Sequence, residues 1–139
     1  MIHHASTHVR WDDLDAFGHI NNAAYLTLMQ EARADFTWYS RKLRGEKPIF
    51  ADMVVARAEV DYLEPIHQGG IIVDVAITVS RMGTSSFDLH YVVTHDGVVR
   101  ASGKTVQVAV SMDTQRSRPL SDLERDFLTR YLEVLVEGK

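Results

Sequence analysis

The residues best suited to chemistry gather where a helix is predicted to begin. Asp15 and His19 lie shortly before Asn21 and Asn22, and asparagine is a preferred helix N-cap. The carboxylate of Asp15 would then lie near free backbone amides at the positive end of the helix. Those amides would stabilise an oxyanion while Asp15 attacks a carbonyl group or activates a water molecule. This segment predicts a site that cleaves an acyl group.

A thioester is the acyl substrate for which so sparse a site is adequate. Its leaving group comes from a thiol with a pKa of about 8.5 and needs no strong general acid. An amide would need its amine protonated, and a phosphate ester would call for a metal or several cations. The chemistry favours thioester cleavage, provided that these residues form a site.

Simpler interpretations stay open for the same residues. The run Asp12-Asp13-Leu14-Asp15 is also typical of a solvated turn. His19 either orients Asp15 or the substrate, or is satisfied by backbone groups near the helix start. Glu31 either supports the site or pairs with Arg33 or a neighbouring chain. Tyr25 belongs either to the core or to the wall of an acyl pocket.

Composition narrows the classes of protein. The 139 residues are 45% hydrophobic and 24% charged, as expected for a single domain over residues 1–139. Cysteine is absent, which excludes disulfides, zinc-thiolate sites and a cysteine nucleophile. The net charge of −4 argues against nucleic acid as a partner. No apolar run approaches the roughly 18 residues that span a bilayer, and no targeting segment is evident, so we expect a cytoplasmic protein without a membrane partner.

Two helices are predicted from apolar spacing. The first starts at Asn21 or Asn22 and ends near 41–45. Its buried stripe comprises Tyr25, Leu28, Met29, Ala32, Phe36 and Tyr39, with Leu26 and Trp38 off the stripe. The second follows Pro119, with Ser121 and Glu124 spaced as a capping box. Its apolar face comprises Leu123, Phe127, Leu128, Tyr131, Leu132 and Leu135.

Five strands are predicted from alternating residues. The first places Thr7, Val9 and Trp11 on one face, and the second runs half-buried from Val54 to Tyr62. The third and fourth have inward faces over 71–79 and 85–93, and Asp96-Gly97 forms a tight hairpin turn. The last begins at Val98, with a bulge at Gly103 where the inward phase slips between Ala101 and Val106.

This order of elements predicts an α+β fold in which an antiparallel sheet curls around one buried helix. Such a sheet has open edges. Pairing them across a symmetric interface would cover them, so we expect a homodimer or homotetramer.

The segment at the helix start resembles the signature of the hotdog-fold acyl-CoA thioesterases, the 4-hydroxybenzoyl-CoA thioesterase-like family. The matching residues are Asp13-x-Asp15-x-x-Gly18-His19-x-Asn21-Asn22-x-x-Tyr25, then Glu31-Ala32-Arg33, Val60-Asp-Tyr-Leu-Glu-Pro-Ile-His-Gln-Gly69 and Arg81-Met-Gly-Thr-Ser-Ser-Phe87. The resemblance spans nearly all of residues 5–112. It implies a hotdog fold with a five-stranded antiparallel sheet around a long central helix, plus a C-terminal helix.

The resemblance also implies an activity, which is hydrolysis of an acyl-CoA to free acid and coenzyme A at sites between subunits. Asp15 would be the nucleophile or general base, the Asn22 amide would polarise the carbonyl, and His19 would complete the catalytic set. Tyr25, Arg81, Ser86 and Lys104 would bind substrate. The combination of His19 with Asn21-Asn22 is more similar to the fatty acyl-CoA members. No cofactor or metal is implied.

Several alternatives stay open beside this interpretation. Arg81, Lys104, Arg116 and Arg118 either bind coenzyme A phosphates or form ordinary surface. His3, His4 and His8 are expected to be exposed rather than metal ligands. A hotdog hydratase uses motifs that are absent from this sequence, whereas a non-catalytic acyl-CoA or acyl-carrier-binding protein would keep the fold without turnover.

Overall fold

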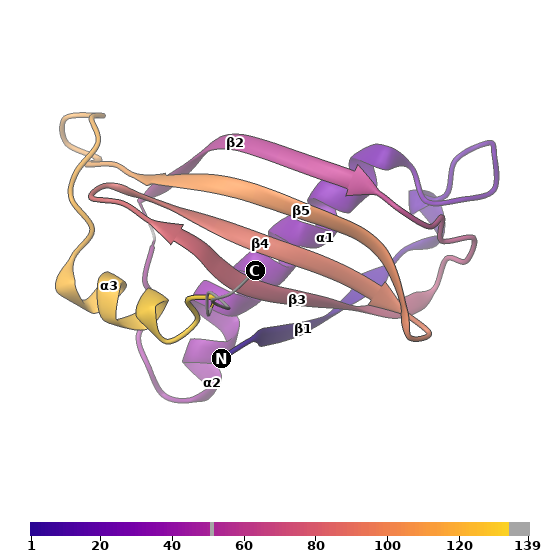
Figure 1. The fold of residues 1–139 in the computed structure, drawn as a ribbon, viewed down its shortest axis with the longest axis horizontal. Helices are drawn as coiled ribbons and strands as arrows, with labels where there is room; N and C mark the ends of the chain where they lie inside the picture. The colour runs from indigo at the N-terminus through magenta and orange to yellow at the C-terminus, as the bar shows by residue number, and fades with distance from the viewer. Residues whose placement is uncertain (51, 134–139) are drawn as a thin grey trace, which may run out of the picture.

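One antiparallel sheet and one long helical segment organise the chain. The computed structural model describes residues 1–50 and 52–133. The sheet has five strands in the order β1-β3-β4-β5-β2, and α1 lies across one face of it (Figure 1). The strands are β1 His3–Val9, β2 Met53–Tyr62, β3 Ile71–Met82, β4 Ser86–His95 and β5 Val98–Ala109; the helices are α1 Asn22–Ala34, α2 Ser40–Leu43 and α3 Asp122–Thr129.

The first helix begins where the sequence predicts. The side chain of Asn21 accepts a hydrogen bond from the Ala23 amide, and four apolar residues of the predicted stripe are buried along α1, namely Tyr25, Leu28, Met29 and Ala32. A π-helical turn over Asp35–Tyr39 joins α1 to α2, so the helical segment continues through 22–43. Because that turn adds a residue to the helical repeat, the stripe shifts, and Tyr39 is 59% exposed rather than buried as predicted.

The central strands follow the predicted alternation. Val73, Val75, Ile77 and Val79 are buried on β3, and Phe87, Leu89, Tyr91 and Val93 are buried on β4. Asp96 and Gly97 both have positive φ, 52° and 73°, as the tight turn between β4 and β5 requires. These strands form the inner wall against which α1 packs.

The first strand ends earlier than predicted. His3, Ala5, Thr7 and Val9 face inward from β1. Trp11 does not continue that face, because the chain turns into a short 3-10 segment over Trp11–Asp13 and leaves the Trp11 side chain 75% exposed.

The bulge predicted at Gly103 lies instead at Arg100. Val93 pairs with Ala101 while Thr94 pairs with Val99, which leaves Arg100 as the extra residue. Inward alternation then runs unbroken from Ala101 to Ala109, and Val106 faces the other side. Gly103 serves close packing, because Met29 of α1 lies directly against it.

The second strand is an uncovered edge rather than the half-buried strand predicted. Its residues are half-buried or exposed along its whole length. A register shift between Val55 and Arg57 changes the phase, so Val54 does not share a face with Tyr62. Residues of β2 that pair with inward-facing residues of β5 lie on the inner face of the sheet. They are Met53, Val55, Ala58, Val60 and Tyr62.

The C-terminal helix has the predicted capping box between Ser121 and Glu124. Phe127, Leu128 and Tyr131 are buried, but Leu123 is 55% exposed because it lies on the outer side of the short helix. Leu135 lies outside the described residues. The arrangement confirms the predicted α+β class and is consistent with a hotdog fold. None of the helices in 1–50 and 52–133 is long and apolar enough to cross a bilayer.

Candidate functional site

The loop that carries Asp15 is held in place by backbone hydrogen bonds. The Asn21 amide donates to the Asp13 carbonyl at 2.7 Å, and the Ile20 amide donates to the Ile66 carbonyl at 2.8 Å. The Asp15 amide donates to the His19 carbonyl at 2.9 Å, which closes a tight turn. These bonds fix the position of Asp15 relative to the start of α1.

Asp13 supports this loop and is not free for chemistry. Its carboxylate accepts hydrogen bonds from the backbone amide of Arg10 at 2.8 Å and from the Arg10 guanidinium at 2.9 Å. Burial alone would raise the Asp13 pKa, but the bonds and the charge of Arg10 outweigh it and hold that pKa below its ordinary value. Asp13 is therefore a structural anion.

Asp15 keeps one carboxylate oxygen available. Oδ1 accepts a hydrogen bond from the Phe17 amide at 2.9 Å. Oδ2 lies 3.9 Å from Nδ1 of His19, too far for a hydrogen bond. The side chain is 24% exposed, so Oδ2 can meet a water molecule or a substrate carbonyl.

The start of α1 offers a free donor. The Asn21 side chain occupies the Ala23 amide at 2.8 Å, and the Ala24 amide bonds the Asn21 carbonyl at 2.9 Å. Within residues 1–50 and 52–133 the Asn22 amide makes no hydrogen bond. It is a free N–H at the positive end of a helix, where a developing negative charge is stabilised.

A hollow of about 250 Å³ opens beside this helix start. Its lining is His19, Ile20, Asn22, Tyr25, Tyr62, Leu63, Glu64 and Pro65. Tyr25 is both a core residue, 3% exposed, and part of this wall, and burial is the main cause that raises its pKa. The Tyr25 and Tyr62 rings meet edge to face at 5.3 Å, and the Tyr62 hydroxyl donates to the Asn22 carbonyl at 3.1 Å.

The bulged residue Arg100 holds the outer wall of the hollow. Its guanidinium donates to the Pro65 carbonyl at 2.9 Å, and its own carbonyl accepts from the Leu63 and Glu64 amides, each at 3.0 Å. The segment over 63–65 is thus fixed to β5.

His67 is a neighbour of the site that sequence reasoning did not single out. Its ring lies 6.1 Å from that of His19, and its Nδ1 is 3.3 Å from the Gly18 carbonyl. His67 belongs to the segment Val60–Gly69, which matches the family signature. That match indicates the end of a strand and does not by itself indicate a site residue.

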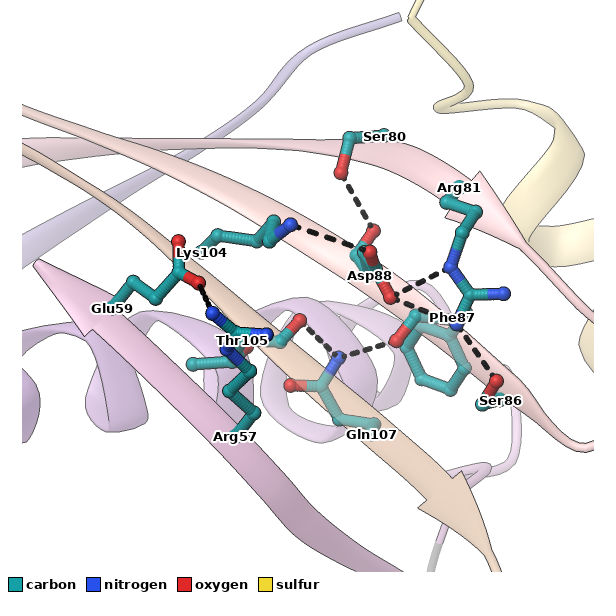
Figure 2. A network of polar contacts seen from close by, with 10 residues as sticks. All are labelled: Arg57, Glu59, Ser80, Arg81, Ser86, Phe87, Asp88, Lys104, Thr105 and Gln107. Carbon is teal, nitrogen blue, oxygen red and sulfur yellow. Dashed lines mark hydrogen bonds and ion pairs between the residues drawn. The ribbon is translucent and has the colours of Figure 1, made fainter.

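Arg81, Ser86 and Lys104 form a second cluster, around Asp88 (Figure 2). The Arg81 guanidinium donates to the Asp88 carboxylate at 3.1 Å and to the Ser86 hydroxyl at 2.8 Å. The Lys104 ammonium is 3.8 Å from the other Asp88 oxygen. Asp88 is buried, whereas the Arg81 and Lys104 side chains are 48% and 41% exposed, so two cations surround one anion.

Other predicted polar residues have different surroundings. Glu31 is exposed and has no salt bridge to Arg33, whose guanidinium bonds the Tyr91 hydroxyl at 3.0 Å. Arg118 is held by the Glu124 carboxylate at 2.9 and 3.0 Å, whereas Arg116 is exposed.

His3 is buried rather than exposed as predicted, because Nε2 contacts the Asp35 carboxylate at 2.8 Å. In the part of the chain that the structure describes, no three His, Asp or Glu side chains are grouped to hold a metal ion.

A second hollow, of about 270 Å³, lies at the Met53 end of β2. Its lining is Gln30, Arg33, Ala34, Thr37, Trp38, Tyr39, Phe50, Met53, Val54, Val55, Phe87 and Gln107. Most of these side chains are apolar, and the wall on the β2 side is the uncovered sheet edge.

Comparison with known proteins shows the family of the chain. Residues 9–129 match the model of the thioesterase-like superfamily. A structure of a predicted thioesterase from Bacillus stearothermophilus is 27% identical, with a TM-score of 0.83 over 96% of this chain and 98% of that one. A thioesterase from Thermus thermophilus, solved in complex with coenzyme A and Zn, is 34% identical, with a TM-score of 0.75 over 92% of each chain.

A curated relative, the uncharacterized protein YsmA of Bacillus subtilis (strain 168), is 27% identical over 121 residues, 86% of this chain and 80% of its own length. The family match spans most of the chain, including the Asp15 loop, α1 and all strands after β1. The chain therefore belongs to the thioesterase-like superfamily.

Proposed function

We propose that this protein is an acyl-CoA thioesterase that hydrolyses a fatty acyl-CoA to the free acid and coenzyme A. The observation that carries the proposal is that the hydrogen-bonded segment over 13–22 holds both an Asp15 carboxylate oxygen without a hydrogen bond and the unbonded Asn22 backbone amide. Family membership and the relative solved with coenzyme A support it.

The chemistry follows from these two groups. The Asn22 amide donates to the thioester carbonyl oxygen and stabilises the negative charge that develops there. As a general base, Asp15 takes a proton from water while the water oxygen bonds the carbonyl carbon. As a nucleophile, Asp15 forms a mixed anhydride that water then hydrolyses. In both routes the C–S bond breaks and the thiolate leaves with its electron pair.

His19 has a positioning role in this proposal. Its ring stacks on Phe17 at 6.2 Å and stands beside Asp15 Oδ2. It also lines the hollow in which the thioester would lie.

The coenzyme A would bind at the cluster of Arg81, Ser86 and Lys104. The two cations, Arg81 and Lys104, exceed the single carboxylate of Asp88 by one positive charge, and the Arg81 guanidinium donates to the Ser86 hydroxyl. Exposed guanidinium and ammonium groups of this kind suit phosphate groups.

The proposed active unit is a symmetric dimer through β2. The β2 edge is uncovered, and Val55 and Tyr62 on its inner face are 45% and 48% exposed; Leu26 on the neighbouring helix is 43% exposed. Antiparallel pairing of two β2 edges would satisfy their free backbone groups and cover this apolar surface.

Such pairing would also join the two hollows. A two-fold axis through the middle of β2 sets the Tyr62 end of one copy beside the Met53 end of the other. The hollow at the start of α1 would then continue into the partner's hollow at Met53. The Arg81–Ser86 end of the partner's sheet would lie at the same end of the dimer as Asp15. Each site would need both copies.

The deciding experiment measures thiol release from a panel of short, long and aromatic acyl-CoAs. The Asp15→Asn variant should fold normally and lose at least about a hundredfold in kcat while retaining substrate binding. Asp12→Asn, at an exposed position in the same loop, should retain activity. An inert wild type that binds acyl-CoA would indicate a non-catalytic binding protein, and an active Asp15→Asn variant would exclude Asp15 as the catalytic carboxylate.

A further inference from the structure

The hollow at the Met53 end of β2 has a polar floor under apolar walls. Gln107 of β5 contributes to that floor and is 2% exposed. Its Oε1 is the one buried side-chain oxygen or nitrogen without a hydrogen-bond partner among the described residues. A buried acceptor left unpaired is costly, so its presence in a binding hollow needs a reason.

The orientation of the Gln107 amide is fixed by its surroundings. Its Nε2 donates to the Phe87 carbonyl at 3.2 Å and to the Thr105 carbonyl at 3.3 Å, as Figure 2 shows. Rotating the amide by half a turn would set Oε1 against two carbonyl oxygens, which cannot donate. The group left over is therefore an acceptor and requires a donor.

A cation lies in the wall of the same hollow. Arg33 of α1 is half-buried there and has no carboxylate partner among the described residues. One of its N–H groups reaches the Tyr91 hydroxyl at 3.0 Å, and Tyr91 in turn contacts the Thr105 hydroxyl at 2.6 Å. The guanidinium carries five N–H donors, so others remain for a ligand.

We infer that Gln107 is a specificity-determining residue, and that this hollow selects acyl groups that carry a hydroxyl. A hydroxyl donates one hydrogen bond, which Gln107 Oε1 needs, and accepts another, which Arg33 can supply. The inference rests on the proposed acyl-CoA function, in which this hollow receives the acyl group bound at the partner's Asp15.

Other acyl groups match the floor less well. A plain hydrocarbon chain leaves Oε1 unpaired, and a carboxylate would accept from Arg33 but repel Oε1. Oε1 is covered by neighbouring side chains, so a ligand must displace one of them; Met53, half-buried in the same lining, has an unbranched side chain that can move.

The test compares matched pairs of acyl-CoAs with and without a hydroxyl. Decanoyl-CoA is paired with its hydroxylated forms, substituted near the carbonyl, at mid-chain and at the terminus, and benzoyl-CoA is paired with hydroxybenzoyl-CoA. Wild type should prefer one hydroxylated member by about tenfold in kcat/KM, roughly the worth of one hydrogen bond. The aliphatic and aryl arms identify the source of the hydroxyl.

Gln107→Met keeps the length of the side chain but removes the acceptor, and should abolish that preference. Gln68→Met makes the same change at an exposed glutamine that does not line this hollow, and should keep the preference. Affinities of the same pairs for the Asp15→Asn protein, with and without Gln107→Met, give a reading independent of turnover.

The outcomes separate the two proposals. Turnover without any hydroxyl preference overturns the inference and leaves the thioesterase function standing. A hydroxyl preference in binding that depends on Gln107, with no turnover of any member, overturns the function and supports the recognition. Retention of the preference by Gln107→Met, or its equal loss in Gln68→Met, overturns the role of Gln107.

Discussion

Gly103 on β5 lies against Met29 on α1 so closely that a Cβ atom on the glycine would stand 2.6 Å from Met29 Cε. The same Cβ would stand 2.9 Å from the Glu59 carbonyl oxygen. The absence of a side chain at this position sets how deeply the helix sits in the sheet. The depth of α1 in turn sets the position of its first residues relative to the loop that carries Asp15.

Gly103→Ala should therefore destabilise the protein by about 1–3 kcal/mol, because an added methyl group overpacks this contact. Chemical denaturation of the purified protein measures the change. Adding Met29→Val to the Gly103→Ala variant should restore part of the lost stability, because it removes the clash with the Met29 side chain. The restoration should be incomplete, because the clash with the Glu59 backbone remains. Unchanged stability of Gly103→Ala would show that the helix can move away at little cost.

Asn22→Pro tests the oxyanion donor without disturbing the helix. Proline lacks the amide hydrogen and is well tolerated at the first helical position; Asn21, at φ −58° and ψ 138°, already has the extended backbone that precedes proline. We expect kcat to fall by about a hundredfold with the melting temperature nearly unchanged.

Asn22→Ala is the matched control, because it removes the side chain and keeps the amide. It should retain most of the activity. Equal losses in the alanine and proline variants would assign the role to the Asn22 side chain instead.

Glu124 should give the protein a stability that depends on pH. Burial raises the pKa of its carboxyl, but the hydrogen bonds from Arg118 and Ser121 outweigh it, so the folded pKa lies below its ordinary value. The stabilisation is therefore complete above the unfolded pKa of about 4.3 and is lost as pH falls through the lower folded pKa.

Glu124→Gln should cost about 1–3 kcal/mol at neutral pH, and the gap to wild type should narrow below about pH 4. Urea titrations at a series of pH values provide the measurement. Asp126→Asn, at an exposed position in the same helix, should change stability by less than about 0.5 kcal/mol. A gap that stays constant with pH would rule out the ionised pair as its source.

Ala58→Asp should separate the proposed dimer. Ala58 lies near the middle of β2, so a two-fold axis there would bring the two introduced carboxylates close together. Light scattering should show a change from about twice 15.7 kDa to 15.7 kDa, together with loss of turnover. Ile72→Asp, at another exposed apolar position, should leave the mass unchanged, and a wild-type monomer that is fully active would refute the shared site.

The features that the sequence predicted well are governed by local interactions. Asn21 caps α1 and Ser121 caps α3 through bonds to amides two or three residues away. The buried faces of β3 and β4 follow from strict alternation in strands covered by α1. Asp15 could be selected for its position before the helix, although only the structure shows that Asp13 is already bound by Arg10.

The features that could not be predicted from the sequence depend on contacts between distant segments. A glycine within a strand indicates either a bulge or the close approach of a neighbouring group, and the sequence does not distinguish the two. The bulge predicted at Gly103 is therefore wrong although the glycine itself is significant. The π-helical turn over Asp35–Tyr39 is not indicated by the spacing of apolar residues. His67 reaches the Gly18 carbonyl of the Asp15 loop, and Gln107 lines the hollow at Met53. Both come from distant parts of the chain, and the alternation of apolar residues does not predict what lies opposite them.

The bulge at Arg100 gives the wall of the hollow an attachment to the sheet that the Asp15 loop does not share. The loop of Asp15 is fastened by Asp13 and Ile66, whereas the wall over 63–65 is fastened from β5 by Arg100. The two sets of bonds meet only at Ile66, which follows the wall directly in the chain. Under the proposed function, substitutions in the wall would alter which acyl groups are admitted more than they alter the geometry around Asp15.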